Sequence, residues 1–233
     1  MVSSGFFNGL KHKYYSLLIL LNMKKIFLVF ILFLSSCFYA NRVSYLPSKI
    51  IYIDPGHGGK DNGCVFANVY EDDINLAIAS YLFELFLNSN YISYITRSDD
   101  YDLASLYAKN RKNEDLKKRV KYINESKADL FISIHLNYYE SPSVYGPMVY
   151  YQKNNDSSKL LANLIQNGLN IFTNTNKITH SGDYYLLNKT NVTGVIVECG
   201  FLSNIEERNK LMDSSYQYDL AKTIYDSVRE YLM

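Results

Sequence analysis

Apolar residues follow two alternating patterns from residue 49 onward. Short continuous apolar runs, such as "KIIYID" (49–54) and "DLFISI" (129–134), are typical of buried strands. Between such runs, apolar residues recur every three or four positions, which predicts amphipathic helices. In "EDDINLAIASYLFELFLN" (71–88), the acidic start also suits the positive end of a helix dipole. The predicted strands are 49–54, 91–96, 129–134, 147–152, 184–187 and 193–198, and the predicted helices are 71–88, 113–126, 157–172 and 216–233.

This alternation predicts an α/β fold: a single domain over residues 47–233, with a mostly parallel or mixed sheet and helices on both of its faces. Pro147 favours an edge position for the strand that it opens, because proline cannot donate to a neighbouring strand. Asp156 or Ser157 is expected to cap the helix that begins there.

The segment before the domain resembles an export signal. "MKKIFLVFILFLSSCFYA" (23–40) has two lysines, nine uninterrupted apolar residues and then small polar ones. That apolar run is shorter than the roughly 18 residues of a membrane-spanning helix. Cleavage, retention as an anchor and lipidation at Cys37, which follows "LSS", all stay open. We expect residues 1–46, whether translation starts at Met1 or Met23, to be an export signal or membrane anchor with a linker, and the protein to be extracytoplasmic and membrane-associated.

Composition narrows the class of protein. A hydrophobic content of 48% and a charged content of 20% argue against disorder. The net charge of +1 gives no reason to expect a nucleic-acid partner. Three cysteines are too few for a disulfide framework, so Cys64 and Cys199 are expected to be small buried thiols.

Three predicted strands end at residues that can do chemistry. "IIYIDPGH" ends on His57, "LFISIH" on His135 and "GVIVE" on Glu198. Ligands of open α/β sheets bind beyond the carboxyl ends of the strands, so these side chains should converge at one rim. Glu71, at the start of the following helix, adds a fourth group.

Two histidines and two carboxylates at one rim suggest a catalytic zinc site. Catalytic zinc has three protein ligands and one open position, and His57, Glu71 and His135 make such a set. Glu198 is then left for proton transfer, which also explains a carboxylate at the end of an apolar run. The glycines of "DPGHGGKDNG" would let the backbone pass close to an ion. Taken singly, each of these residues is also compatible with a purely structural role.

Four stretches together resemble the zinc-dependent N-acetylmuramoyl-L-alanine amidases of bacteria. They are "IYIDPGHGGKDNG", "YEDDINLAIA", "LKKRVKYINESKADLFISIHLN" and "GVIVECGFLSNIEE", and the resemblance covers about residues 49–232. It implies a six-stranded sheet, one Zn²⁺ on His57, Glu71 and His135, and Glu198 as the catalytic glutamate. The implied reaction is hydrolysis of the amide between muramic acid and the L-alanine of peptidoglycan stem peptides.

"SIHLN" and "DLKKRVKYIN" resemble the spore-cortex, germination-specific subgroup of that family. This resemblance implies a role in muramic-δ-lactam formation and a location in the forespore intermembrane or cortex space. A vegetative autolysin is the alternative. Because no wall-binding repeats are apparent, a regulatory or tethering protein is a further expected partner.

Several residues have less specific interpretations. Arg97 and Arg119 match recurring family positions and have a structural or a substrate-orienting role, and Asn137 is a third candidate for orienting substrate. Cys199 replaces the apolar residue usual in the family and should face away from the metal, since neighbours on a strand point to opposite faces. His180 is expected at the surface.

Three rival functions stay open. Two histidines and one carboxylate also describe non-haem iron oxygenases. Glu71 and Glu198 could be the carboxylate pair of a glycosidase. The third rival is a catalytically silent peptidoglycan-binding module.

Overall fold

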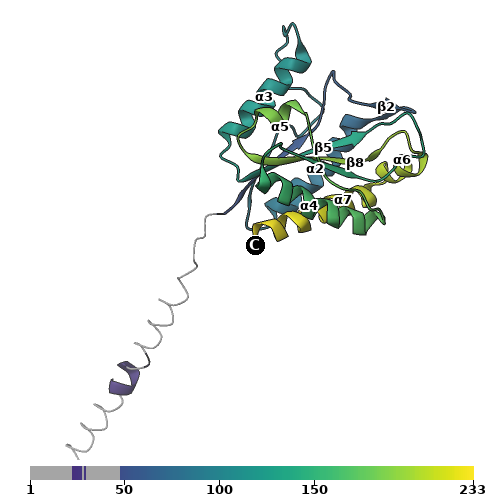
Figure 1. Ribbon diagram of the computed structural model, residues 1–233. Helices are drawn as coiled ribbons and strands as arrows, with labels where there is room; N and C mark the ends of the chain where they lie inside the picture. Colours follow the sequence, from purple (N-terminus) through teal and green to yellow (C-terminus); the bar gives the residue numbers. More distant parts are fainter. Residues whose placement is uncertain (1–22, 28, 30–47) are drawn as a thin grey trace, which may run out of the picture. The chain divides into compact units, whose positions relative to one another are not determined.

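A six-stranded sheet in the order β4-β1-β5-β8-β6-β7 forms the centre of the fold in the computed structural model (Figure 1). The pairs β4–β1, β1–β5, β5–β8 and β6–β7 are parallel, whereas β6 runs antiparallel to β8. The sheet is therefore mixed, and the predicted α/β class and six-stranded sheet are confirmed. The strands are β1 (Ile50–Pro55), β4 (Ile92–Ile95), β5 (Leu130–Asn137), β6 (Met148–Tyr151), β7 (His180–Ser181) and β8 (Thr193–Phe201).

The structure describes residues 23–27, 29 and 48–233, and Ser48–Met233 is one compact unit. Residues 23–27 and 29 are helical. Within these described ranges, no helix combines the length and the apolar character that a membrane crossing requires. Cys37 and most of the predicted export signal lie outside the described residues.

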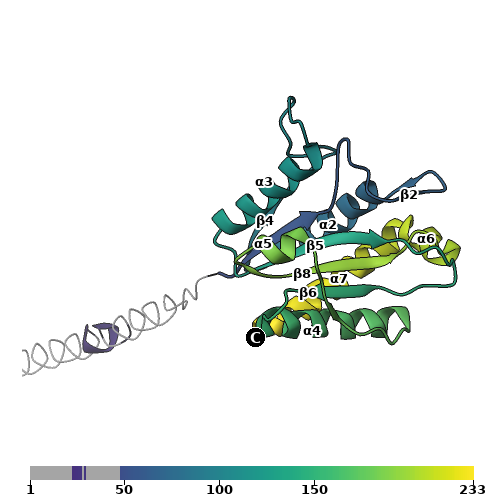
Figure 2. The same ribbon diagram turned by 45° about the horizontal axis from the view of Figure 1, so that its top comes forward.

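Helices cover both faces of the sheet, as Figure 2 shows. On one face α2 (Glu71–Leu87) and α4 (Asp156–Thr173) pack against α7 (Ser214–Leu232). On the other face lie α3 (Arg111–Glu125) and the short α5 (Tyr185–Lys189). The remaining elements are α6 (Ile205–Leu211) and a hairpin of β2 (Val65–Phe66) and β3 (Val69–Tyr70) that leads into α2.

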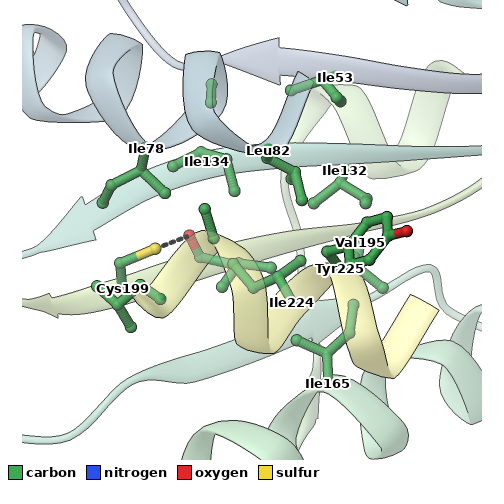
Figure 3. Close-up of a cluster of buried hydrophobic side chains, with 14 of the residues drawn as sticks. Ile53, Ile78, Leu82, Ile132, Ile134, Ile165, Val195, Cys199, Ile224 and Tyr225 are labelled. Carbon is green, nitrogen blue, oxygen red and sulfur yellow. Dashed lines mark hydrogen bonds between the residues drawn. The ribbon is translucent and has the colours of Figure 1, made fainter. Parts of the chain in front are cut away.

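Successive side chains of the central strands point to opposite faces of the sheet, so the core consists of two clusters. Ile53, Ile132 and Val195, from three adjacent strands, face the larger helix layer, where Ile78 and Ile224 meet them (Figure 3). The intervening strand residues pack under α3 and α5. A strand buried on both faces is expected to be continuously apolar, which is the pattern of these runs.

Cys199 belongs to the larger core cluster (Figure 3), and its thiol lies 3.9 Å from the carbonyl oxygen of Val197. It therefore points to the opposite face from its neighbour Glu198, as predicted. Cys64 and Cys199 are both free thiols, although Cys64 is only partly buried.

Some predicted elements are wrong or shifted. Residues 184–187 do not form a strand: Tyr185–Lys189 is helical, and His180–Ser181 takes the place beside β6. A four-residue apolar run fits a buried helical turn as well as a strand, so periodicity could not separate them. Neither Asp156 nor Ser157 caps α4; Asn155 does, by accepting the N–H of Ser158 at 2.9 Å.

Pro147 does not place its strand at an edge. It directly precedes β6, which lies between β8 and β7. Since the ladder with β8 begins at Met148, the missing N–H of the proline costs no strand hydrogen bond.

Candidate metal centre

Three parallel neighbouring strands bring the predicted residues to one rim. β1, β5 and β8 are adjacent, so their carboxyl ends meet at the same edge of the sheet. His57 follows β1 by two residues, and His135 lies directly opposite Glu198 in the β5–β8 ladder. One ligand atom from each of His57, Glu71 and His135 lies within 4.8 Å of the others.

The carboxylate of Glu71 lies between the two imidazoles. Its Oε1 is 3.3 Å from His57 Nε2 and 3.1 Å from His135 Nδ1. The two rings are nearly perpendicular, at 81°, with centroids 5.0 Å apart. Burial raises the pKa of Glu71, but the two histidines lower it by more, so this carboxyl stays ionised.

Hydrogen bonds from the backbone and one amide fix the orientation of Glu71. Its Oε2 accepts the N–H of Cys64 at 2.7 Å, and its Oε1 accepts from Asn75 Nδ2 and from the N–H of Leu136, both at 3.2 Å. The carboxylate is therefore held before any ligand arrives, by groups from three different segments.

His57 has an equally constrained setting. Its backbone is in the left-handed region, at φ 60°. Its Nδ1 lies 3.0 Å from Asp61 Oδ2, which leaves Nε2 on the Glu71 side. Burial lowers the pKa of His57, but hydrogen bonds to Asp61 and Glu71 raise it to about 9. That proton must leave before the imidazole can bind a metal, so metal binding releases it.

Two glycines make room for the ligands. A Cβ at Gly56 would overlap the ring of His135, and a Cβ at Gly63 would overlap the Glu71 carboxylate. Gly63 also has φ +65°, a conformation that glycine adopts without strain. The close approach of backbone to ligand expected of this loop is therefore present at both ends of it.

Glu198 lies beside this trio but is not one of the three. It is 7% exposed, and its Oε2 has no hydrogen-bond partner within residues 48–233. Its Oε1 accepts a hydrogen bond of 3.5 Å from the hydroxyl of Tyr184. Burial raises the pKa of Glu198 to about 7, and the nearby Glu71 charge acts in the same direction against the two histidines.

These side chains open into a cavity of about 310 Å³. Its walls come from the loop after β1, from α3 and from the start of α5. Besides the four residues above, the wall includes Asp61, Lys112, Leu116, Arg119, Tyr184, Tyr185 and Leu186.

The remaining candidates lie around the site rather than in its centre. Arg97 and Arg119 are 1% and 2% exposed, and both donate hydrogen bonds to the Pro55 carbonyl. Their burial and these bonds favour a structural role over a substrate-orienting one. The side chain of Asn137 accepts the N–H of Tyr138 at 2.8 Å, so it stabilises its own loop. His180 is exposed, as expected.

Sequence reasoning missed three residues of the site: Asp61, Asn75 and Tyr184. The first two stand four residues after His57 and Glu71, respectively, a spacing that could have indicated a supporting contact. Tyr184 gives no such signal, because the apolar pattern predicts a strand over its segment, 184–187.

The donor set fits a metal ion. Two imidazoles and one carboxylate suit a zinc ion with an open position, and they equally suit the iron of an oxygenase. Geometry alone does not choose between hydrolysis and oxidation.

Comparison with known proteins makes that choice. The family model for N-acetylmuramoyl-L-alanine amidases matches residues 51–230. The chain belongs to this family. Its activity is accordingly hydrolysis of the amide between N-acetylmuramic acid and L-alanine, which removes the oxygenase and the glycosidase as alternatives.

Individual relatives agree with this assignment. The germination-specific N-acetylmuramoyl-L-alanine amidase of Bacillus subtilis is 36% identical over 214 residues, which cover 87% of this chain and 90% of the relative. The CwlD amidase of Clostridioides difficile, solved in complex with the GerS lipoprotein, superposes with a TM-score of 0.77 at 38% identity, over 79% of this chain and 98% of that one. The catalytic domain of CwlV from Bacillus (Paenibacillus) polymyxa gives a TM-score of 0.70 at 34% identity, over 79% and 98% of the two chains.

Proposed function

We propose that this amidase is zinc-dependent, that His57, Glu71 and His135 hold the ion, and that Glu198 carries the proton. Two observations at the rim support this proposal. Three ligand atoms lie within 4.8 Å of one another, and the buried Glu198 carboxylate beside them has one oxygen with no partner in the described part of the chain. A zinc ion at these ligands supplies a Lewis acid for the scissile carbonyl and acidifies the attacking water.

The protein groups divide the remaining work. Glu198 Oε2 takes the proton of the attacking water and gives it to the nitrogen of the departing L-alanine. A carboxyl whose pKa lies near neutrality suits both steps, because it must accept and then donate. Asp61 and Asn75 keep His57 and Glu71 oriented through their hydrogen bonds.

The test is digestion of purified muropeptides, followed by mass spectrometry of the released stem peptides. Glu198→Gln should lower the rate by roughly 10²–10⁴-fold while zinc content is unchanged. Glu84→Gln, at an exposed position of α2, is the matched control. Near-normal turnover by the Glu198 variant, or wild-type activity that survives a chelator, would overturn the proposal.

For the biological setting, we propose the spore cortex. The germination-specific relative and the CwlD structure both match nearly their whole length here. The vegetative alternative has the support of the LytC amidase of Bacillus subtilis, which is 31% identical but of which the chain covers only 35%. Deleting the gene should remove muramic-δ-lactam from the cortex and leave the vegetative wall unchanged. A normal cortex with a cell-separation defect would favour the autolysin.

A lipoprotein partner and export complete the proposal. The CwlD relative was solved with a lipoprotein, and this chain is similar to it over 98% of that structure. Purified enzyme with zinc should therefore be less active on intact cortex fragments than enzyme with its partner. Full activity of the enzyme alone would argue against a helper.

Mass analysis of the mature N-terminus, with Cys37→Ser as control, separates lipidation from cleavage or retention.

A further inference from the structure

Tyr184 is the one residue in the described part of the chain that donates a hydrogen bond to the Glu198 carboxylate. The bond joins the Tyr184 hydroxyl to Oε1, at 3.5 Å, and the other oxygen, Oε2, has no partner among residues 48–233. The two oxygens of one buried carboxylate are therefore not equivalent.

The position of Tyr184 suits this contact. It is the residue before α5, with extended backbone at φ −100° and ψ 143°, and its side chain does not cap the helix. Its ring packs against the ring of Tyr150 on β6, with centroids 5.2 Å apart at an angle of 62°. The backbone and the aromatic contact thus hold the phenol at the wall of the catalytic cavity, beside Glu198.

The hydroxyl of Tyr184 stays a donor. Burial raises the pKa of Tyr184, and the negative charge of Glu198 raises it further, so the phenol keeps its proton at neutral pH. It cannot replace Glu198 as the base. Its contribution to catalysis must pass through the carboxylate that it contacts.

We propose that Tyr184 is a positioning residue for the amidase reaction. By donating to Oε1, it fixes the rotamer of Glu198 and leaves Oε2 as the oxygen that takes and returns the proton. This inference rests on the proposed role of Glu198. It adds a residue from a segment outside the four stretches that carry the family resemblance.

The test is a double-mutant cycle of Tyr184→Phe and Glu198→Gln, with kcat and KM measured on a purified muropeptide. Tyr184→Phe keeps the ring and its contact with Tyr150. It should lower kcat roughly fivefold, the effect of an ordinary rather than a strong hydrogen bond because the contact is 3.5 Å long, and leave KM and zinc content unchanged. In the Glu198→Gln background, the same change should cause no further loss. Tyr94→Phe, on the edge strand β4, is the control for removing a tyrosine hydroxyl elsewhere.

Two results would overturn the inference. An unchanged kcat in Tyr184→Phe, with Glu198→Gln inactive, would show that the hydroxyl is not used. An equal loss in both backgrounds would show that Tyr184 contacts substrate independently of Glu198. Near-normal activity of Glu198→Gln alone is a separate outcome, which removes the proposed proton carrier itself. Thermal unfolding midpoints within about one degree of wild type ensure that a fall in kcat does not come from unfolding.

Discussion

The guanidinium of Arg119 donates a hydrogen bond to the backbone carbonyl of His57, at 2.5 Å. A side chain on α3 thereby stabilises the loop that contains His57, a candidate metal ligand. Arg119 also donates to the Pro55 carbonyl and forms ion pairs with Asp54, at 2.8 Å, and Asp115, at 2.7 Å. All three side chains are buried, so one cation is the shared partner of two buried carboxylates.

Replacing Arg119 with Met should therefore cost stability rather than substrate binding. It leaves two buried carboxylates without their cation, and the free energy of unfolding should fall by roughly 3–5 kcal/mol. Urea denaturation measures this. Lys117→Met, at an exposed position of the same helix, should change it little. If both variants unfold at the wild-type urea concentration, Arg119 does not stabilise the loop.

Asp54 should make stability depend on pH in the acid range. Burial raises the pKa of Asp54, but Arg119 and the hydrogen bonds from Ser133 and Thr96 lower it by more, so its folded-state pKa is below that of the unfolded chain. Its contribution to stability is present above the unfolded pKa, about 3.9, and is lost as pH falls through the folded value. Asp54→Asn should be less stable at pH 7 and show a flatter decline in acid. A decline parallel to that of wild type would assign the acid sensitivity to other groups.

Asp61→Asn should weaken zinc binding without removing a ligand. The change takes away the negative charge that orients His57 through Nδ1, and supporting contacts of this kind contribute about 10–100-fold to metal affinity. Competition with a chromogenic chelator measures the change in Kd. Asp73→Asn, at an exposed position in the first turn of α2, is the control. Equal affinities of the two variants would contradict a supporting role for Asp61.

Gly63→Ala should damage the metal site through sterics alone. The added methyl would overlap the Glu71 carboxylate, and alanine at φ +65° costs about 1–2 kcal/mol. We expect low zinc content after purification together with a reduced free energy of unfolding. Wild-type zinc content in this variant would mean that the loop can move away from Glu71.

The residues at the centre of the site are easier to predict from the sequence than the residues around them. His57, His135 and Glu198 are predictable because each lies at the end of an apolar run or shortly after it, and a sheet edge gathers strand ends whatever the loops do. Tyr184 gives no comparable signal, and Asp54 ends an apolar run without indicating its partner, since the roles of both depend on tertiary contacts with residues 14 and 65 positions away, respectively. The same limit applies to β7, whose two residues form a strand only because β6 lies beside them.

The strand order has a consequence for biosynthesis. β8 is the last strand to be made, yet it lies between β5 and β6, and it contributes Glu198. The sheet therefore cannot close, and its core cannot form, before β8 (Thr193–Phe201) has been synthesised. Pairing between segments so distant in sequence is slow. Late closure of this sheet leaves the chain unfolded for longer, a property that export through a translocation channel requires.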